Sequence, residues 1–516
     1  MATISLGDHP LQLDELQSLR LAGTQVALAA DSIERVRHSR QSVETALASG
    51  KAIYGLNTGF GKLAGVQIPH DKCTRLQRNL LVSHACGVGD PLPVDQCRLA
   101  LGLRIHALAW GYSGVRLELL EQAIALFNAD MIPVIPSQGS VGASGDLAPL
   151  AHMALPLIGM GTVSCGGEVL DAADALARLG REPLELSEKE GLALINGTQI
   201  MTAIGLCALA QAQVAAKTAD IACAMTVEAL RGSDGPFEAR IHELRTHRGQ
   251  RDTAGNLRTL LKASQVMQSH VDCGKVQDAY SLRCAPQVHG AAKDGLRHVA
   301  EVLETEANSV TDNPLVFAPD DILSGGNFHG QPVSQVLDFL AIAVSTLANI
   351  SERRIEQLVN PDISGLPAFL AGDPGLGSGF MIPHVVAAAL ASENKTLAHP
   401  ASVDSIPTSA SREDHVSMGV TAARHAEQVV GNTVRVLGIE LLCAAQGFDL
   451  AAERDGTRHR SGAGVEAALA AVRKAVPVMG EDRFLAPDLA AAEQLVADGA
   501  FVAAVEAVTG ELALGR

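Results

Sequence analysis

The feature that most limits how this chain can fold is an almost continuous Ala-rich apolar segment from Ile200 to Leu230. Gln211, Gln213, Lys217 and Asp220 interrupt the segment, so it is too polar to cross a membrane. A helix that is apolar on nearly every side belongs in the core of a large protein. The segment therefore predicts a buried helix within a helical bundle.

The composition agrees with a fold of packed helices. Only 3% of the 516 residues are aromatic while 47% are hydrophobic, so the core must consist mainly of Ala, Leu, Val and Ile. Ala-rich apolar runs favour close-packed helices. Helical spacing of apolar residues recurs in residues 8–50, including 27–30, in 93–128 and 150–160, and after Val333.

Charge, termini and cysteines limit the class of protein. The net charge of −17 argues against nucleic-acid binding, which needs clustered Lys and Arg. Residues 1–22 lack the pattern of a secretory signal, and the longest apolar stretch, Phe339 to Ile350, is too short to span a bilayer. The nine cysteines are scattered without a CxxC pair, so neither a zinc site nor a disulfide framework is expected. We expect a cytoplasmic protein that binds neither membrane nor nucleic acid.

The densest cluster of small residues is GSVGASGDLAPL, residues 139–150. Flexible residues up to Asp146, followed by apolar ones, predict a tight loop that leads into a helix. A phosphate-binding loop is not supported, because the stretch has no Walker lysine and no alternating βαβ context.

The triplet Ala143-Ser144-Gly145 within this loop can react with itself. The amide nitrogen of Gly145 can attack the carbonyl carbon of Ala143, because glycine alone leaves that nitrogen unhindered. Loss of water and then of the Ser144 hydroxyl would leave a five-membered ring with an exocyclic methylidene. Such a ring is an electrophile made from the chain itself, whereas the structural alternative is an ordinary Gly/Ser turn.

Tyr54 and His84 are candidates for chemistry in two other motifs. Tyr54 lies in the stretch YGLNTGFG, which predicts a mobile loop, and its phenol could exchange a proton if a positive field lowered its pKa. His84 follows Ser83 at the end of an apolar helical run, where a lone His is usually just hydrogen-bonded. The structural alternative for Tyr54 is a core or hinge aromatic.

Asn196, Asp146 and the EDH sequence at 413–415 each have a structural alternative. Asn196 precedes a glycine and could simply end a helix, and Asp146 could simply begin one. Glu413-Asp414-His415 could suggest metal ligands. Consecutive residues on a helix point in different directions, however, so no metal site is expected there.

Gln277, Tyr280 and Arg283 are spaced three residues apart. On a helix this spacing places them on one broad polar face. The guanidinium of Arg283 is a planar two-pronged donor that suits a carboxylate, although an internal salt bridge is the alternative.

Together these motifs resemble the aromatic amino-acid ammonia-lyase family over roughly residues 50 to 450. In that family the Ala-Ser-Gly triplet matures into 4-methylideneimidazole-5-one, so the resemblance implies this group, formed from Ala143-Ser144-Gly145, and no external cofactor. It also implies a homotetramer in which each site is lined by residues from more than one subunit.

The resemblance implies a role for each candidate residue. Tyr54 and Tyr280 are both candidates for the base that removes the β-proton, and Asp146 assists ring formation. The residues implied in substrate binding are Ser83, His84, Asn196, Gln277, Arg283, Phe328 and Glu413.

Ser83-His84 and Glu413 resemble the histidine branch of the family, which implies elimination of ammonia from L-histidine to give trans-urocanate. The chain departs from that branch at Ser411-Arg412, Gly377 and Pro383-His384, positions expected near the site or its walls. Two other functions stay open: the same ring acting on another amino acid, as a lyase or aminomutase, and a helical scaffold that never forms the ring.

We therefore expect a mainly α protein, an elongated bundle of long helices with a loop-rich active-site end. Residues 1–200 are predicted to form an N-terminal active-site region that carries the electrophile loop. Residues 201–516 are predicted to form a long-helix bundle region that completes the site. The two regions are expected to make one continuous lyase fold.

Overall fold

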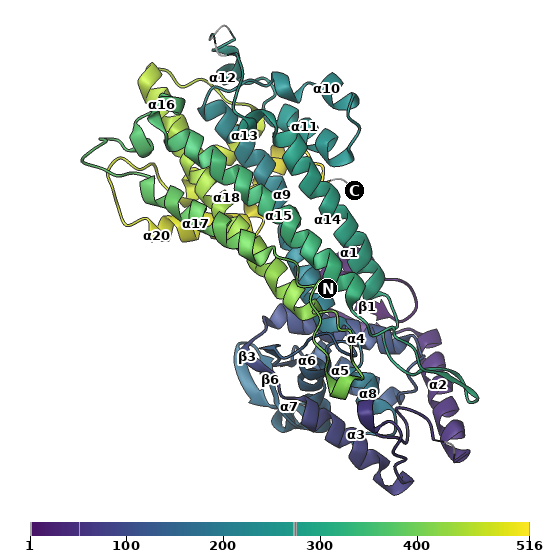
Figure 1. Ribbon diagram of the computed structural model, residues 1–516. Helices are drawn as coiled ribbons and strands as arrows, with labels where there is room; N and C mark the ends of the chain where they lie inside the picture. Colours follow the sequence, from purple (N-terminus) through teal and green to yellow (C-terminus); the bar gives the residue numbers. More distant parts are fainter. Residues whose placement is uncertain (1–2, 51, 272–273, 275, 515–516) are drawn as a thin grey trace. The chain divides into compact units, whose positions relative to one another are not determined.

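The computed structural model describes residues 3–50, 52–271, 274 and 276–514. Most of these residues lie in α-helices, and the strands are short and pair in small sheets (Figure 1). The prediction of a mainly α fold with long helices is confirmed.

The chain divides into two compact units that interleave along the sequence. Unit 1 comprises residues 1–207, 300–338 and 400–424, and unit 2 comprises 208–299, 339–399 and 425–516. The boundary falls within each of four long helices, which are α9 (Gln199–Ala229), α14 (Ala285–Ala307), α15 (Gln331–Val359) and α18 (Gly419–Asp455). That the units make one continuous lyase fold stays a prediction.

Unit 1 contains every strand that the structure describes. The parallel pair is β1 (Thr3–Leu6) with β2 (Gln25–Leu28), and the antiparallel partners are β3 (Val88–Pro91) with β5 (Pro136–Gln138), β4 (Ile132–Pro133) with β6 (Thr162–Cys165), β6 with β7 (Glu168–Asp171), and β8 (Leu315–Ala318) with β9 (Asp321–Leu323). Its shorter helices are α1 (Leu13–Leu19), α2 (Ala30–Ala48), α3 (His70–His84), α4 (Val94–Ala109), α5 (Leu117–Asn128), α6 (Leu147–Ala154), α7 (Ala172–Arg178) and α8 (Glu190–Ile195).

The core of unit 1 is built around α4. Its residues from Gln96 to Ala109 are all buried, including Arg98 and Arg104. Buried arginines need polar partners, and these two bind carbonyl and side-chain oxygens of neighbouring segments. Arg104 also donates to the carbonyl of Ala193, within α8.

Unit 2 is helical wherever it has regular structure in the described residues. Its shorter α-helices are α10 (Ala239–Glu243), α11 (Arg248–Leu260), α12 (Gln265–Gln268), α13 (Tyr280–Arg283), α16 (Pro361–Ser364), α17 (Met381–Leu397), α19 (Ala463–Ala475), α20 (Ala486–Ala497) and α21 (Ala500–Thr509).

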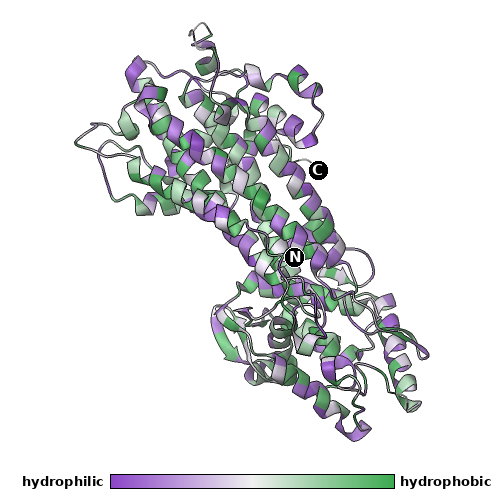
Figure 2. Cartoon of the chain, in the orientation of Figure 1, coloured by the Kyte–Doolittle hydropathy of each residue, from purple (hydrophilic) through white to green (hydrophobic). Residues whose placement is uncertain are grey.

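The long helix α9 coincides with the Ala-rich segment from Ile200 to Leu230. Two helices, α9 and α15, are long and apolar enough to cross a membrane by length and composition alone. Their apolar windows are, however, 78% and 67% buried inside the protein, as in core helices of soluble proteins. Hydrophobic residues accordingly run through the long helices in Figure 2. The prediction that Ile200 to Leu230 forms a buried helix is confirmed.

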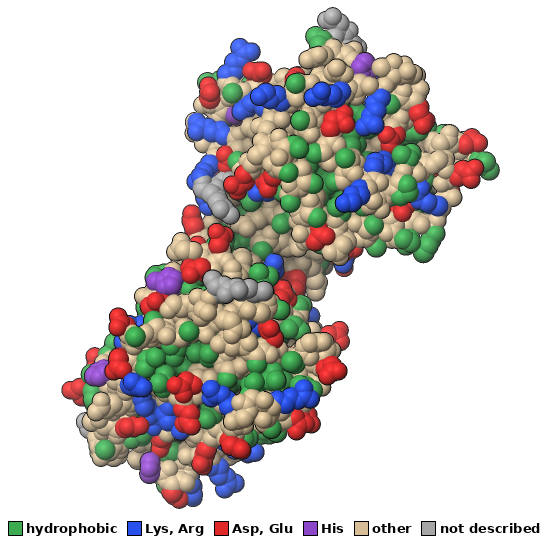
Figure 3. Space-filling model, turned by 180° about the vertical axis from the view of Figure 1, so that it is seen from behind, with side chains coloured by type: hydrophobic (Ala, Val, Ile, Leu, Met, Phe, Trp, Pro, Cys, Tyr) green, Lys and Arg blue, Asp and Glu red, His purple; other side chains and the backbone are tan. Residues whose placement is uncertain are grey.

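The surface charge is mixed on the face drawn in Figure 3. Acidic and basic side chains are interspersed there, although the chain carries a net charge of −17. No disulfide bond joins the cysteines that the structure describes.

Three local predictions are wrong. Residues 25–28 form strand β2, paired in parallel with β1, instead of a helix, because a short apolar run cannot be assigned by periodicity alone. Gln277 precedes the four-residue helix α13 and does not share a helix with Tyr280 and Arg283, since Ala279 is extended. Glu413 to His415 are not helical either, because Glu413 pairs with Thr408 and α18 begins only at Gly419.

Candidate active site

The electrophile loop, residues 139–146, lies between β5 and α6, as predicted. Ser144 and Gly145 have φ values of 52° and 78°, in the left-handed region. That region costs a non-glycine residue roughly 1–2 kcal/mol. A Cβ at position 145 would lie 2.1 Å from the carbonyl oxygen of Gly197, so only glycine fits there. Packing therefore requires the same glycine that ring formation would require.

Two side chains bind Ser144 from opposite ends of the residue. The Asn196 Nδ2 donates a hydrogen bond of 2.7 Å to the Ser144 carbonyl oxygen. The Ser144 Oγ donates to the Glu413 Oε1 at 3.3 Å. Asn196 is also the C-cap of α8. It therefore ends a helix, as the structural alternative proposed, and at the same time lies beside the triplet.

Asp146 joins the loop to the first turn of α9. Its backbone N–H donates to the Gly197 carbonyl, and its Oδ2 accepts N–H groups of Ile200 at 3.0 Å and Met201 at 2.9 Å. Ser140 Oγ donates to Oδ1. Burial raises the pKa of this carboxyl to about 7, against the lowering effect of those hydrogen bonds. Asp146 occupies the N-cap position of α6 but its side chain makes no cap bond to that helix.

A cavity of about 820 Å³ opens in unit 1 beside Ser144. It brings together side chains from six separate segments of the sequence. The predicted residues that line it are Tyr54, Ser83, His84, Ser144, Asn196, Phe328 and Glu413. Ala143 and Gly145 line a second cavity of about 250 Å³ that shares Ser83, His84 and Glu413. The structure therefore brings these predicted residues to one site, and their roles stay predictions.

Tyr54 packs edge-to-face on Phe60, with ring centroids 6.4 Å apart. Burial raises the pKa of the Tyr54 phenol and the negative charge of Glu413 raises it further, whereas a hydrogen bond with the backbone of Gly61 lowers it. The phenol therefore keeps its proton near neutral pH. A role as base would need a positive charge nearby to lower this pKa.

His84 is the last residue of α3 and its Nδ1 lies 3.0 Å from the Ser83 Oγ. Burial lowers the pKa of the imidazole, while a backbone contact at Leu80 and the charge of Glu413 raise it. A neutral imidazole has one donor and one acceptor nitrogen. His84 can therefore exchange hydrogen bonds with a ligand that also carries a donor and an acceptor.

Glu413 is fixed by Thr408, a residue that sequence reasoning missed. The Thr408 Oγ1 donates to Glu413 Oε2 at 2.7 Å, and the two backbones form an antiparallel bridge. The only sequence signal for this contact is that Thr408 carries a hydroxyl five positions before Glu413. Within the described part of the chain, no group of three or more His, Cys, Asp or Glu could hold a metal ion.

Gln277, Tyr280 and Arg283 belong to unit 2 and are not among the described residues that line the cavity. Tyr280 is 70% exposed, and the Arg283 guanidinium lies 4.5 Å from the centre of the Tyr280 ring. The structure thus brings together predicted residues of unit 1 around one cavity, and these three do not line it.

The positions that depart from the histidine branch divide in the same way. Arg412 lines the cavity, whereas Gly377, Pro383 and His384 belong to unit 2. His384 Nε2 lies 2.9 Å from the Glu352 Oε1. Sequence reasoning also missed Asn313 as a lining residue, because its TDNP motif is typical of a turn.

Comparison with known proteins establishes the family. A sequence model described as aromatic amino acid lyase matches residues 11–474. The chain belongs to the aromatic amino acid lyase family. The resemblance seen in the motifs is thereby confirmed.

Individual relatives match over almost their whole length. The chain is 53% identical over 513 residues to the histidine ammonia-lyase of Symbiobacterium thermophilum, covering 99% of this chain and 100% of that protein. The crystal structure of histidine ammonia-lyase from Trypanosoma cruzi matches with a TM-score of 0.89 and 43% identity, over 98% of this chain and 95% of that one. The tyrosine aminomutase from Streptomyces globisporus matches with a TM-score of 0.93 and 39% identity, over 99% and 100%.

Proposed function

We propose that this chain eliminates ammonia from L-histidine to give trans-urocanate, as a cytoplasmic enzyme of histidine degradation. The observation that carries the proposal is the cavity in which His84 and Glu413 lie beside Ser144. An imidazole has a donor and an acceptor nitrogen, which a neutral His84 and the Glu413 carboxylate can satisfy together. A phenyl ring could form a hydrogen bond with neither group.

The residues of the loop fit 4-methylideneimidazole-5-one formed from Ala143-Ser144-Gly145. Position 145 has no room for a side chain, and Asn196 Nδ2 donates to the Ser144 carbonyl oxygen. When formed, this ring would supply an electrophilic carbon that makes the amino group of the substrate a better leaving group. The proposal needs no external cofactor.

The β-proton of the substrate must go to a base, either Tyr280 or Tyr54. Burial and the charge of Glu413 raise the pKa of Tyr54, so little of its phenolate, the form that would accept the proton, is present near neutral pH. This supports Tyr280 for proton removal and leaves Tyr54 as a hydrogen-bond donor over the ring. Asp146, tied to the start of α9, would hold the loop for ring formation.

Arg283 would anchor the carboxylate of the substrate. Its Nε is buried and has no hydrogen-bond partner among the described residues. A buried donor left unpaired costs about 1–3 kcal/mol, which a bound carboxylate would recover. Gln277 and Phe328 would complete the pocket. Gln277 and Arg283 do not line the cavity of unit 1, and we propose that another subunit of a homotetramer supplies them.

The test is ammonia release from purified protein offered L-His, L-Phe and L-Tyr separately, with urocanate followed by its ultraviolet absorbance. We expect L-His alone to react, and Ser144→Ala to abolish nearly all activity because it removes the hydroxyl that ring formation expels. Release from L-Phe or L-Tyr instead would contradict the substrate assignment.

The same assay separates the two other candidate functions. An aminomutase acting through the same ring is favoured by the close fold of a tyrosine aminomutase, and would yield a β-amino acid without releasing ammonia. A scaffold would keep its function in Ser144→Ala, because it would not use the ring.

A further inference from the structure

A buried polar frame encloses Gly197, the residue on which Gly145 packs. The frame consists of Arg104, Lys189, Gln199, Thr311 and Asp312, none of which is more than 3% exposed. Two of these side chains are cations, and one is a carboxylate. A Cβ at position 197 would lie 2.4 Å from the Arg104 Nη1, so the frame leaves no free space there.

The central contact of the frame is the ion pair between Lys189 and Asp312. Lys189 Nζ donates to Asp312 Oδ2 at 2.5 Å, and both side chains are completely or almost completely buried. The other oxygen of Asp312 accepts the N–H of Asn313, which lines the cavity beside Ser144. Removing one partner of such a pair would leave an uncompensated buried charge.

The remaining contacts of the frame join it to α8. Arg104 donates to the carbonyl of Ala193 in α8 and, at 3.0 Å, to Gln199 Oε1. Gln199 Nε2 donates to Thr311 Oγ1 at 2.9 Å, and Thr311 adjoins Asp312. A backbone hydrogen bond links these contacts back to Lys189, because the Ala193 N–H donates to the Lys189 carbonyl.

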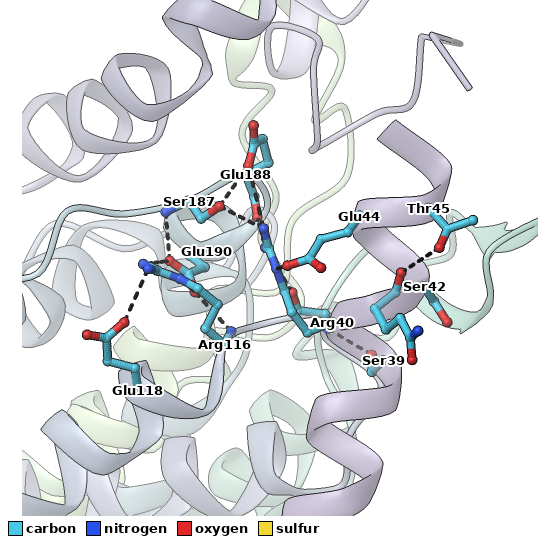
Figure 4. A network of polar contacts seen from close by, with 12 residues as sticks. Ser39, Arg40, Ser42, Glu44, Thr45, Arg116, Glu118, Ser187, Glu188 and Glu190 are labelled. Carbon is cyan, nitrogen blue, oxygen red and sulfur yellow. Dashed lines mark hydrogen bonds and ion pairs between the residues drawn. The ribbon is translucent and has the colours of Figure 1, made fainter. Parts of the chain in front are cut away.

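The outer side of the same segment is held by two arginines (Figure 4). Arg40 of α2 donates to Ser187 Oγ at 2.7 Å and to the Glu188 carbonyl at 3.0 Å. Arg116 forms three hydrogen bonds with the Glu190 carboxylate, of 2.9 Å from its backbone N–H and of 2.9 and 2.8 Å from its guanidinium. Lys189 points into the frame between these two anchors, so the start of α8 is fixed from both sides.

Helix α8 is only six residues long, and Lys189 and Asn196 flank it directly. Any shift of Lys189 therefore moves Asn196, whose Nδ2 contacts the Ser144 carbonyl, and Gly197, which receives Gly145. The backbone of Lys189 is itself left-handed, with φ of 74°. A lysine persists in this conformation only where its surroundings hold it.

We infer that Lys189, through its ion pair with Asp312, is a positioning residue that holds Asn196 and Gly197 against the Ala143-Ser144-Gly145 triplet for ring formation and turnover. The inference rests on the proposed function. Ring formation joins the Gly145 nitrogen to the Ala143 carbonyl carbon. It expels two water molecules, one with the carbonyl oxygen and one with the Ser144 hydroxyl, and needs no oxidant.

Three variants of the full chain test the inference. Lys189→Met breaks the ion pair, and Lys189→Met combined with Asp312→Asn removes both charges while an acceptor for the Asn313 N–H remains. Arg98→Met is the matched control, because Arg98 is an equally buried cation on the same helix as Arg104 that instead binds the Phe127 carbonyl. The readouts are the mass of the loop peptide, kcat, KM and the unfolding midpoint.

In Lys189→Met, we expect a smaller fraction of the loop peptide to show the loss of two water molecules. We also expect kcat per mature ring to fall on the order of 100-fold, because a small misplacement of reacting groups has an effect of this size. KM should change little, because the substrate-binding side chains remain. Arg98→Met should lower the unfolding midpoint but keep the complete ring and kcat.

The double variant separates positioning from stability. It removes the Asp312 charge that Lys189→Met leaves without its ion-pair partner, so its unfolding midpoint should return toward that of the wild type while the ring fraction and kcat stay low. Wild-type ring content and kcat in the double variant would overturn the inference, as would an equal loss in Arg98→Met. A wild-type protein that lacks the ring would overturn the proposed function and this inference with it.

Discussion

Glu413 accepts hydrogen bonds from two groups of the site at once. Its Oε2 accepts the Thr408 hydroxyl and its Oε1 accepts the Ser144 hydroxyl. Because ring formation would remove the Ser144 hydroxyl, Oε1 would then be left to bind the substrate. The same carboxylate oxygen would therefore be occupied before ring formation and available to the substrate after it, beside a neutral His84.

Glu413→Gln tests this assignment with a change of charge at nearly constant size. A hydrogen bond to a charged group contributes about 1.5–3 kcal/mol, so kcat/KM for L-histidine should fall roughly 10- to 100-fold. Steady-state assays with L-His and L-Phe check it, with Asp414→Asn as the control because Asp414 is an exposed neighbour. An unchanged kcat/KM for L-histidine would mean that Glu413 does not contact the imidazole.

Residue identities in the triplet could be predicted from the sequence, because their chemistry is local. Gly145 was expected for its unhindered nitrogen, and the structure adds the carbonyl of Gly197 as a second reason. The partners of Lys189 could not be predicted, since Asp312 is far away in the sequence and the TDNP motif is typical of any turn. Contacts of this kind follow from tertiary packing alone.

At the scale of elements, Asp146 couples the loop to the N-terminus of α9. Its Oδ2 accepts two backbone N–H groups that the helix leaves unpaired, at Ile200 and Met201. Burial nevertheless raises the pKa of the carboxyl from 3.8 to about 7. The folded protein therefore holds this proton more tightly than the unfolded chain does.

This raised pKa predicts a pH dependence of stability with a definite sign. Between about pH 4 and pH 7 the folded state binds more protons, so the free energy of unfolding contributed by Asp146 falls as pH rises, by on the order of a few kcal/mol. Asp146→Asn removes this titration. Its free energy of unfolding relative to wild type should increase with pH, as urea unfolding at about pH 5 and pH 8 would measure. A constant difference across that range would contradict the prediction.

Long elements were predicted well and short ones were not. The Ala-rich run at 200–230 corresponds to α9 because a helix of that length carries its own periodic signal. The strand at 25–28 and the turn that excludes Gln277 from α13 are each set by neighbouring segments. In four-residue elements, tertiary contacts override local propensity.

At the scale of the whole molecule, the candidate residues separate by unit. Tyr54, His84 and Asn196 lie in unit 1, whereas Tyr280 and Arg283 lie in unit 2. Sequence motifs could identify both sets, because each motif is local. They could not say which chain of an assembly supplies each set, since identical subunits share one sequence.

Subunit complementation decides this question. Ser144→Ala damages unit 1 and Arg283→Met damages unit 2, so each variant alone should be nearly inactive. If every site takes unit 1 residues from one chain and Arg283 from another, random mixed tetramers would regain about a quarter of the wild-type sites. Co-expression of the two variants, followed by assay of urocanate formation, measures the recovery.

The matched control pairs Ser144→Ala with Asn196→Ala. Both changes fall in unit 1, and the Asn196 side chain contacts Ser144 of its own chain, so no mixed tetramer can rebuild an intact unit 1. Activity in the first mixture and none in the control would assign Arg283 to a neighbouring subunit. Inactivity of both mixtures would mean that each chain completes its own site, and the proposed shared site would be wrong.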